Sequence, residues 1–359
     1  MSGAPTSLGG DSPGVGGTGD LGGAPGESGG FGGSGSEATG GVTSGSGGQN
    51  SPTCGDGNVG SGESCDDAGE SATCDGDCTS RACGDGVVNA TAGEACDDAG
   101  DSASCNASCT VATCGDDYVN PVANEECEPG LNADCAADCT FTYAHFIANR
   151  YSFDGTGTTL VDSVGGADGS AIGTVLSDTG QLSLPNAPYG DLQNGIASAH
   201  ADATFEVWAT WNGGAIYQRI FDLGSSDAGE GSQGEGLTYL LLMPQSETGN
   251  LRATFSDSGT PSDVVLNGAG PMPTGVLTHL AVVADDSNDI MALYVNGAFV
   301  AQALFDESLA SLGDQNNWLG RSQFASDPAF DGAIEEFRIY AKALDAQEIL
   351  ASYTAGPDI

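Results

Sequence analysis

The feature of this sequence that most constrains its fold is the placement of its cysteines. All 12 lie between Cys54 and Cys139, and the rest of the chain has none. Cysteines clustered in even sets predict disulfide bonds, which persist in oxidising compartments. The chain is therefore expected to be extracellular or displayed on a cell surface, although Met1–Gly10 shows neither the basic nor the apolar region of a signal peptide.

The cysteines define three tandem repeats of about 30 residues, over 54–82, 83–113 and 114–140. Each repeat has four cysteines and ends in a C-x3-C pair. Units this small lack a sufficient core, and two disulfides of ~2–4 kcal/mol each would replace it. Four cysteines allow three pairings, which the sequence leaves open. The cysteines expected to be bonded are Cys54, Cys65, Cys74 and Cys78, then Cys83, Cys96, Cys105 and Cys109, then Cys114, Cys127, Cys135 and Cys139.

Structural zinc is the competing interpretation of the repeats, because C-x3-C falls within the allowed ligand spacings. Acidic residues adjoin the cysteines and no histidine lies near them, so disulfides are favoured. The repeats resemble a four-cysteine unit common in secreted and surface proteins of myxobacteria, with a Cys-Gly-Asp-Gly opening and a Gly-Glu-x-Cys-Asp-Asp-Gly centre. Ala68 and Ala99 replace a glycine of that pattern, and Glu128-Pro129 replaces the paired aspartates in the third repeat.

Carboxylates recur in the first two repeats and are candidate Ca²⁺ ligands, since Ca²⁺ takes oxygen ligands. The alternative, which we favour, is that they stabilise tight turns through hydrogen bonds to the nearby backbone. The candidates are Asp56, Glu63, Asp66 and Asp67 in the first repeat and Asp85, Glu94, Asp97 and Asp98 in the second.

The segments outside the repeats differ sharply in composition. Residues 1–53 are rich in Gly, Ser and Pro and are predicted to be a disordered tether. No apolar run approaches the ~18 residues of a membrane span, so no transmembrane segment is expected. Residues 141–359 alternate short apolar stretches with Gly, Asp, Asn, Ser and Pro turns, which is the pattern of an antiparallel sandwich or jelly roll.

The net charge also limits the partners. Acidic residues number 50 and basic residues 7, for a formal charge of −43. Nucleic acid and anionic membrane both require a basic surface, so neither is an expected partner. The charge fits a strongly solvated surface, cation handling with Ca²⁺ as the first choice, or salty surroundings that screen repulsion.

Eleven strands are expected in residues 141–359, followed by one short helix. Asn296-Gly297 predicts a type I′ hairpin turn. Asp345 and Glu348 form a capping box at the start of the helix, with Leu344 and Ile349 as its hydrophobic staple. The expected strands are 146–153, 204–211, 217–223, 237–243, 251–255, 264–267, 277–284, 290–295, 298–304, 317–320 and 330–340.

The C-terminal part resembles laminin-G-like, concanavalin-A-like jelly rolls. The resemblance rests on the order of Thr204-Phe-Glu-Val-Trp-Ala, Ala292-Leu-Tyr-Val-Asn-Gly, Trp318-Leu-Gly-Arg and Phe330-Asp-Gly-Ala-Ile-Glu-Glu-Phe-Arg-Ile-Tyr. It implies an all-β fold of two antiparallel sheets that binds carbohydrate or protein on its concave face or at rim loops. It also implies a Ca²⁺ site formed by Glu335 of the terminal strand, Asp154 and the backbone at Gly155.

Catalysis is not expected. Related glycosidases carry a Glu-x-Asp-x-x-Glu strand with carboxylates on one face, and this chain has no such run. Glu335 and Glu336 are adjacent and point to opposite faces of a regular strand. Glu206 lacks an acidic partner two or four residues on, and the histidines, including His279, are isolated in sequence.

The large aromatic residues offer one weak candidate contact for a ligand. Trp208 lies within an apolar alternation and is expected in the core. Trp211, beside Asn212-Gly213-Gly214, is the candidate at the rim. The sequence therefore predicts an extracellular or cell-surface binding protein whose jelly roll recognises a glycan or an extracellular protein from a disulfide-stapled stalk. The alternatives are a secreted glycoside hydrolase, its accessory carbohydrate-binding module, or a structural envelope component, and the oligomeric state stays open.

Overall fold

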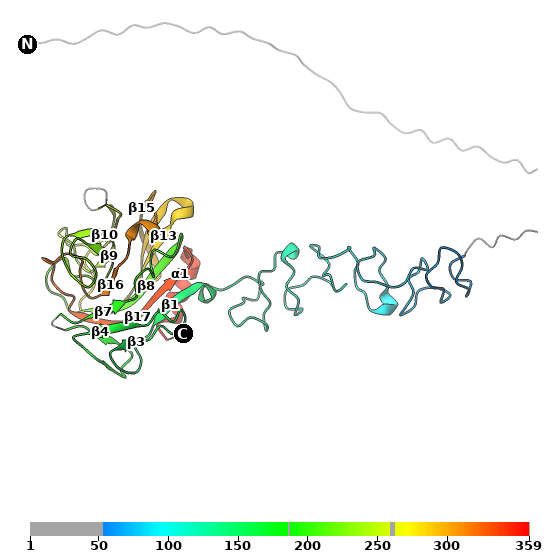
Figure 1. The fold of residues 1–359 in the computed structure, drawn as a ribbon, viewed down its shortest axis with the longest axis horizontal. Coiled ribbons are helices and arrows are strands. Elements are labelled where there is room, and N and C mark those ends of the chain that lie inside the picture. The colour runs from blue at the N-terminus through cyan, green and yellow to red at the C-terminus, as the bar shows by residue number, and fades with distance from the viewer. Residues whose placement is uncertain (1–52, 186, 259–262, 359) are drawn as a thin grey trace, which may run out of the picture. The chain divides into compact units, whose positions relative to one another are not determined.

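The computed structural model describes residues 53–185, 187–258 and 263–358. Apart from Thr53, the predicted tether lies outside the described residues. The described part contains cysteine-rich repeats followed by a β-sandwich (Figure 1).

The repeats consist of turns joined by six disulfides. Within each repeat the first cysteine is bonded to the fourth and the second to the third, so the nested pairing is the one formed. The Cα–Cα separations of 5.5–5.8 Å are ordinary for disulfides. Since all twelve cysteines are bonded, zinc ligation is excluded in this structure and the prediction of disulfides is confirmed. The pairs are Cys54–Cys78, Cys65–Cys74, Cys83–Cys109, Cys96–Cys105, Cys114–Cys139 and Cys127–Cys135.

Regular secondary structure in the repeats is limited to the 3₁₀ turns η1 (Ala90–Ala92) and η2 (Pro121–Ala123). The strands of the sandwich are β1 (Ile147–Tyr151), β2 (Thr156–Gly157), β3 (Thr159–Leu160), β4 (Gly169–Ile172), β5 (Leu176–Ser177), β6 (Leu182–Ser183), β7 (Tyr189–Leu192), β8 (Ala203–Trp211), β9 (Phe221–Ser226), β10 (Gly236–Met243), β11 (Arg252–Ser256), β12 (Val264–Asn267), β13 (Leu277–Asp285), β14 (Ile290–Val295), β15 (Ala298–Leu304), β16 (Asn316–Leu319) and β17 (Gly332–Tyr340). The helical elements there are η3 (Tyr143–Phe146), η4 (Asp286–Asn288), η5 (Leu309–Leu312) and α1 (Ala346–Ala355).

Two antiparallel sheets form the sandwich. Sheet I has the order β1-β17-β8-β13-β14-β15, with β6 also paired to β17. Sheet II has the order β12-β11-β10-β9-β16-β7-β4-β3, and β2 pairs with β5 separately. The predicted all-β sandwich fold is thus confirmed.

The core lies between the sheets, and strand alternation explains how each strand reaches it. On β8, Phe205 and Val207 point inward and pack in the main core cluster with Phe221 of sheet II. Burying each such side chain stabilises the fold by about 1.5–3 kcal/mol. The intervening Glu206 and Trp208 lie on the outer face of sheet I.

Helix α1 covers the outer face of sheet I. The capping box predicted at its start is present, since Asp345 accepts from Glu348 N and Glu348 returns a bond to Asp345 N. Leu344 and Ile349 pack in a second cluster with Val283 of β13 and Tyr340 of β17. Sheet I is therefore covered on both faces, by the core on one and by α1 on the other.

Three of the eleven predicted strands have a boundary two or more residues from the predicted one, and the short strands β2–β7 were not predicted. Predicted strand 217–223 begins only at Phe221, because Tyr217 has a left-handed φ of 67°. Strand 146–153 is shortened because Phe146 belongs to η3 and Phe153 has a φ of 55°. Strand 330–340 begins at Gly332. The type I′ turn fits the positive φ values at both Asn296 and Gly297.

Candidate functional site

The outer face of sheet II carries a cluster of aromatic and apolar side chains. On β10, Leu240 and Leu242 point into the core, so the alternate residues Tyr239, Leu241 and Met243 point outward. Phe324, from the segment between β16 and β17, packs on this outward row, and its ring meets that of Tyr239 edge-on at 5.6 Å between centroids.

This outward row forms the floor of a hollow of about 320 Å³, called here the β10 hollow. The hollow lies over neighbouring strands of sheet II and is closed on one side by the segment before β17. Its lining residues are Tyr217, Arg219, Tyr239, Leu241, Met243, Glu247, Arg252, Thr254, Asp263, Val265, Phe324 and Asp327.

A close backbone approach positions the Phe324 ring. A Cβ atom at Gly236, the first residue of β10, would meet the ring at 2.6 Å, so only glycine lets the ring lie there. The neighbouring backbone is held by hydrogen bonds from Gly234 N to Gln323 O and from Ala325 N to Gly234 O, both 2.9 Å long. The β16–β17 segment is therefore fixed across sheet II.

The two arginines of the hollow are both paired. Arg219 is almost fully buried. It donates from Nη2 to Asp327 Oδ2 at 2.7 Å and from Nη1 to Tyr217 O at 2.6 Å. Arg252 bonds both carboxylate oxygens of Glu247, at 2.7 and 2.9 Å. These ion pairs fix planar polar groups beside the aromatic rings.

A buried acid, Asp222 of β9, lies beside the floor and pairs in register with Leu241. Burial raises the pKa of Asp222 to about 7, opposed by the positive charge of Arg219. Its Oδ2 lies 3.5 Å from Arg219 Nε and accepts from Gln323 N at 2.9 Å. Its Oδ1 has no hydrogen-bond partner among the described residues.

Tyr239 is anchored at its hydroxyl, which donates to Asp263 Oδ1 at 2.9 Å. Burial, and then the bond to Asp263, raises the pKa of Tyr239 well above its usual value. Burial also raises the pKa of Tyr217, with Glu247 adding to the shift. Both phenols stay neutral at physiological pH, so each keeps its proton for a hydrogen bond.

The expectation that Trp211 offers an exposed ring is wrong. Its side chain is 4% exposed, packs in the main core and donates from Nε1 to Gln218 Oε1 at 2.6 Å. Trp208 is buried as expected, but on the outer face of sheet I, where the Arg338 guanidinium lies 4.5 Å from its ring centroid. Chain position near Gly213-Gly214 indicates a loop, but it does not reveal which face a strand-end ring packs on.

The three residues of the predicted Ca²⁺ site differ in burial and in hydrogen bonding. Glu335 is half-buried on β17, and burial followed by the charge of Asp358 raises its pKa. Asp154 is exposed, and the carbonyl of Gly155 accepts from Asp178 N at 2.7 Å. Calcium at these residues stays a prediction.

The neighbouring Glu336 lies at a point where β17 departs from simple alternation. A register shift between Ile334 and Glu336 places Ile334 and Phe337 both in the core. Glu336 is fully buried and its Oε1 lies 2.6 Å from both Arg150 Nε and Arg338 Nε. Glu335, at the irregularity, is thus separated from the buried ion pairs.

The carboxylates of the repeats mainly serve their own turns. Asp66 accepts the backbone N–H groups of Asp56 and Ala68 at 3.0 Å, and the bond from Ala68 leads those that lower its pKa. Asp97 accepts from Gly84, Gly86 and Ala99 in the same way. Asp56 and Asp85 accept from N–H groups two residues on. Asp67 and Asp98 accept from hydroxyl groups.

Two carboxylates of each candidate set lie close together. Glu63 with Asp66, and Glu94 with Asp97, each lie within 4.8 Å of one another and of a cysteine sulfur, Cys78 or Cys109. That sulfur is in a disulfide and is not a thiolate ligand. Glu94 also pairs with Arg81 at 3.0 Å. These contacts support the turn role, and Ca²⁺ binding by the repeats stays a prediction.

A buried polar cluster under α1 brings together Glu206 and His279, which are far apart in the sequence. Glu206 Oε1 lies 2.7 Å from His279 Nε2, and its Oε2 accepts from Tyr340 Oη at 2.6 Å and Ser352 Oγ at 2.8 Å. The other ring nitrogen of His279 accepts from Gly297 N at 3.2 Å. Strand register brings these residues together from β8, β13 and β17, and no spacing along the chain signals it.

The comparisons agree with the fold. Residues 176–350 match the laminin-G-type family described as the Concanavalin A-like lectin/glucanases superfamily, and this region is a concanavalin A-like domain. A search of curated proteins found no match. Within the part of the chain that the structure describes, no helix is both long enough and apolar enough to cross a membrane.

Several solved structures are similar to this chain at low identity. Domain 4 of AbnA, an extracellular arabinanase of Geobacillus stearothermophilus solved with arabinotriose, is 24% identical, with a TM-score of 0.46, and the match covers 57% of this chain and 97% of that one. The CBM40 of a Ruminococcus gnavus sialidase, bound to α2,3-sialyllactose, is 19% identical, with a TM-score of 0.37 and coverage of 43% and 83%. A botulinum neurotoxin type C structure is 15% identical, with a TM-score of 0.43 and coverage of 57% and 52%.

Proposed function

We propose that the concanavalin A-like domain is a binding module that takes a carbohydrate in the β10 hollow. The observation that carries this proposal is the lining: three aromatic rings lie beside two fixed arginine–carboxylate pairs on a face that α1 does not cover. A sugar ring presents apolar C–H faces and a rim of hydroxyls. The partly exposed rings of Tyr217 and Phe324 can stack on the apolar C–H faces, and the paired polar groups can hydrogen-bond to the hydroxyls.

The charges of the lining favour a neutral sugar over an acidic one. The hollow holds two arginines, Arg219 and Arg252, against three acids, Glu247, Asp263 and Asp327. Both guanidinium groups already bond carboxylates, so binding an anionic sugar would require breaking an ion pair. The net charge of −43 also repels anions.

The proposed setting is extracellular. Six disulfides in the repeats are consistent with an oxidising environment. The repeats would then present the binding domain, with Ca²⁺ at Glu335 as an additional component of the proposal. A domain that binds sugar without cleaving it would serve attachment or targeting.

A glycan array probed with the full chain, in parallel with Ca²⁺ and with EDTA, tests the proposal. We expect neutral oligosaccharides to be bound and their sialylated or uronic-acid counterparts to be bound at least tenfold more weakly. Release of product from any array glycan would favour the hydrolase instead. Absence of binding to every glycan would contradict the carbohydrate proposal, and loss of binding in EDTA would support the Ca²⁺ component.

A further inference from the structure

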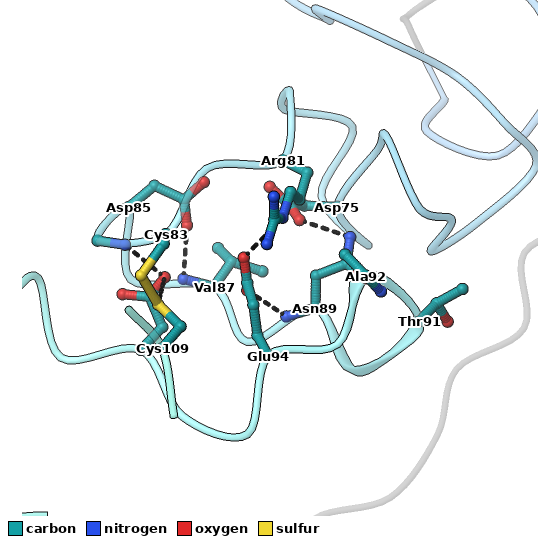
Figure 2. A network of polar contacts seen from close by, with 12 residues as sticks. Asp75, Arg81, Cys83, Asp85, Val87, Asn89, Thr91, Ala92, Glu94 and Cys109 are labelled. Carbon is teal, nitrogen blue, oxygen red and sulfur yellow. Dashed lines mark hydrogen bonds and ion pairs between the residues drawn. A yellow bond between two sulfur atoms is a disulfide. The ribbon is translucent and has the colours of Figure 1, made fainter. Parts of the chain in front are cut away.

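The cysteine-rich repeats are joined to one another by a buried asparagine. Asn89 of the second repeat donates from Nδ2 to three acceptors of the first, at 2.8 Å to Ser71 O, 3.0 Å to Cys74 O and 2.9 Å to Asp75 Oδ1. Figure 2 shows the bond to Asp75 beside Glu94 and Arg81. The Asn89 side chain is fully buried.

The next junction repeats the same arrangement with the third repeat as donor. Asn120, also fully buried, donates from Nδ2 at 2.9 Å to Ser102 O, 3.2 Å to Cys105 O and 2.9 Å to Asn106 Oδ1. The same three hydrogen bonds thus recur at both junctions, and each such set of bonds between neighbouring repeats is called here a joint.

Each donor side chain is held in place by its own repeat. The carboxamide oxygen of Asn89 accepts from Ala92 N in η1, and Asn89 N donates to Glu94 Oε2, both at 2.8 Å. Glu94 is in turn paired at 3.0 Å with Arg81 of the first repeat, so this ion pair also crosses the junction (Figure 2). At the second junction Asn120 N donates to Glu125 Oε2 at 2.8 Å. A buried amide with every bond made orients its neighbours rigidly, and breaking it leaves buried acceptors unpaired.

The sequence lacks the unused donor in the first repeat and the unused acceptor in the third. The donor stands six residues after the first cysteine of a repeat, and there the first repeat has Gly60. The acceptor side chain directly follows the third cysteine, as Asp75 and Asn106 do, and there the third repeat has Ala136. Each repeat thus has a donor or acceptor side chain where it adjoins another repeat, and the first and third repeats lack the one that would point away from the set.

We propose that the three repeats are one coupled spacer with two equivalent joints, ended by repeats that each lack the half of the joint they would not use, in place of three units that reorient freely. Repeat arrays of this kind gain order from nearest-neighbour interfaces and end in altered terminal units. The proposal is independent of the carbohydrate proposal, because no residue of the β10 hollow takes part in a joint.

Residual dipolar couplings on the ¹⁵N-labelled full chain test the joint. In the unchanged protein we expect the N–H vectors of all three repeats to fit one alignment tensor. In Asn89→Ala we expect the first repeat to need a separate tensor of smaller magnitude, while the second and third still share one. Asn58→Ala is the matched control, since among the described residues the Asn58 side chain hydrogen-bonds to Asp56 of its own turn alone.

A second variant separates the joint from the turn that carries it. Asp75→Ala removes an acceptor in the first repeat and leaves Asn89 and η1 unchanged, so we expect it to loosen the same junction. Disulfide mapping of each variant verifies that the nested pairs persist. Different tensors in the unchanged protein, or one shared tensor retained in both Asn89→Ala and Asp75→Ala, would overturn the proposal.

Discussion

At the scale of single residues, the β10 hollow depends on an acid with an unusual environment. Asp222 is buried beside Arg219, and its pKa of about 7 lies far above the usual value of ~3.9. The folded state therefore binds the proton more tightly than the unfolded state does. Its contribution to stability is present below about pH 4 and is lost as the pH rises to about 7.

Replacing Asp222 with Asn removes this titration while keeping the shape of the side chain. We expect Asp222→Asn to gain stability relative to the unchanged protein between pH 5 and pH 8, by at most a few kcal/mol since one pKa unit is worth ~1.4 kcal/mol. Urea unfolding followed by tryptophan fluorescence at both pH values measures the difference. Asp306→Asn, at an exposed site, is the control. A stability difference that does not vary with pH would rule out the titration.

At the scale of elements, the sequence predicts local structure well and contacts between strands poorly. Alternation, the Asn296-Gly297 turn and the Asp345–Glu348 capping box are local signals, and each matches the structure. The Glu206 cluster depends on the register of β8, β13 and β17. The register shift in β17 changes which of its later residues face the core, so simple alternation along β17 does not predict which side chains join the cluster. The nested disulfide pairing is likewise a property of the folded loop.

The Glu206 cluster makes the attachment of α1 to sheet I testable. Glu206→Ala removes the acceptor of Tyr340 Oη and Ser352 Oγ and the contact to Arg338 Nη1 at 3.4 Å, while Arg338 keeps Glu336. Breaking a buried ion pair costs about 3–5 kcal/mol. We expect Glu206→Gln, which keeps hydrogen-bonding capacity, to cost clearly less. Equilibrium denaturation of both variants provides the comparison. Equal, small losses of under about 1 kcal/mol would mean that the cluster does not stabilise the domain.

At the scale of the whole molecule, covalent and non-covalent stabilisation occupy different parts of the chain. The repeats hold every disulfide, and the sandwich holds the large apolar core. Which face of that sandwich is free could not be predicted, because it depends on where α1 packs. Trp211 was misplaced for a different reason, because chain position near a loop does not reveal that its ring points into the core.

This division predicts the effect of reduction. Dithiothreitol should unfold the repeats, which lose about 2–4 kcal/mol per disulfide, while the cysteine-free sandwich stays folded. Limited proteolysis after reduction should then release a stable fragment that begins near residue 141. Digestion of the sandwich at the same rate as the repeats would show that the two parts depend on each other for stability.

The most direct test of the central claim is calorimetric titration of the full chain with the neutral glycan that binds best on the array. We expect Phe324→Ala, which removes a ring of the β10 hollow, to weaken binding at least tenfold, or ~1.4 kcal/mol. Phe299→Ala, which removes a 53% exposed ring on β15 of the other sheet, should leave the affinity unchanged. Equal affinities for Phe324→Ala and the unchanged protein would contradict a carbohydrate site in this hollow.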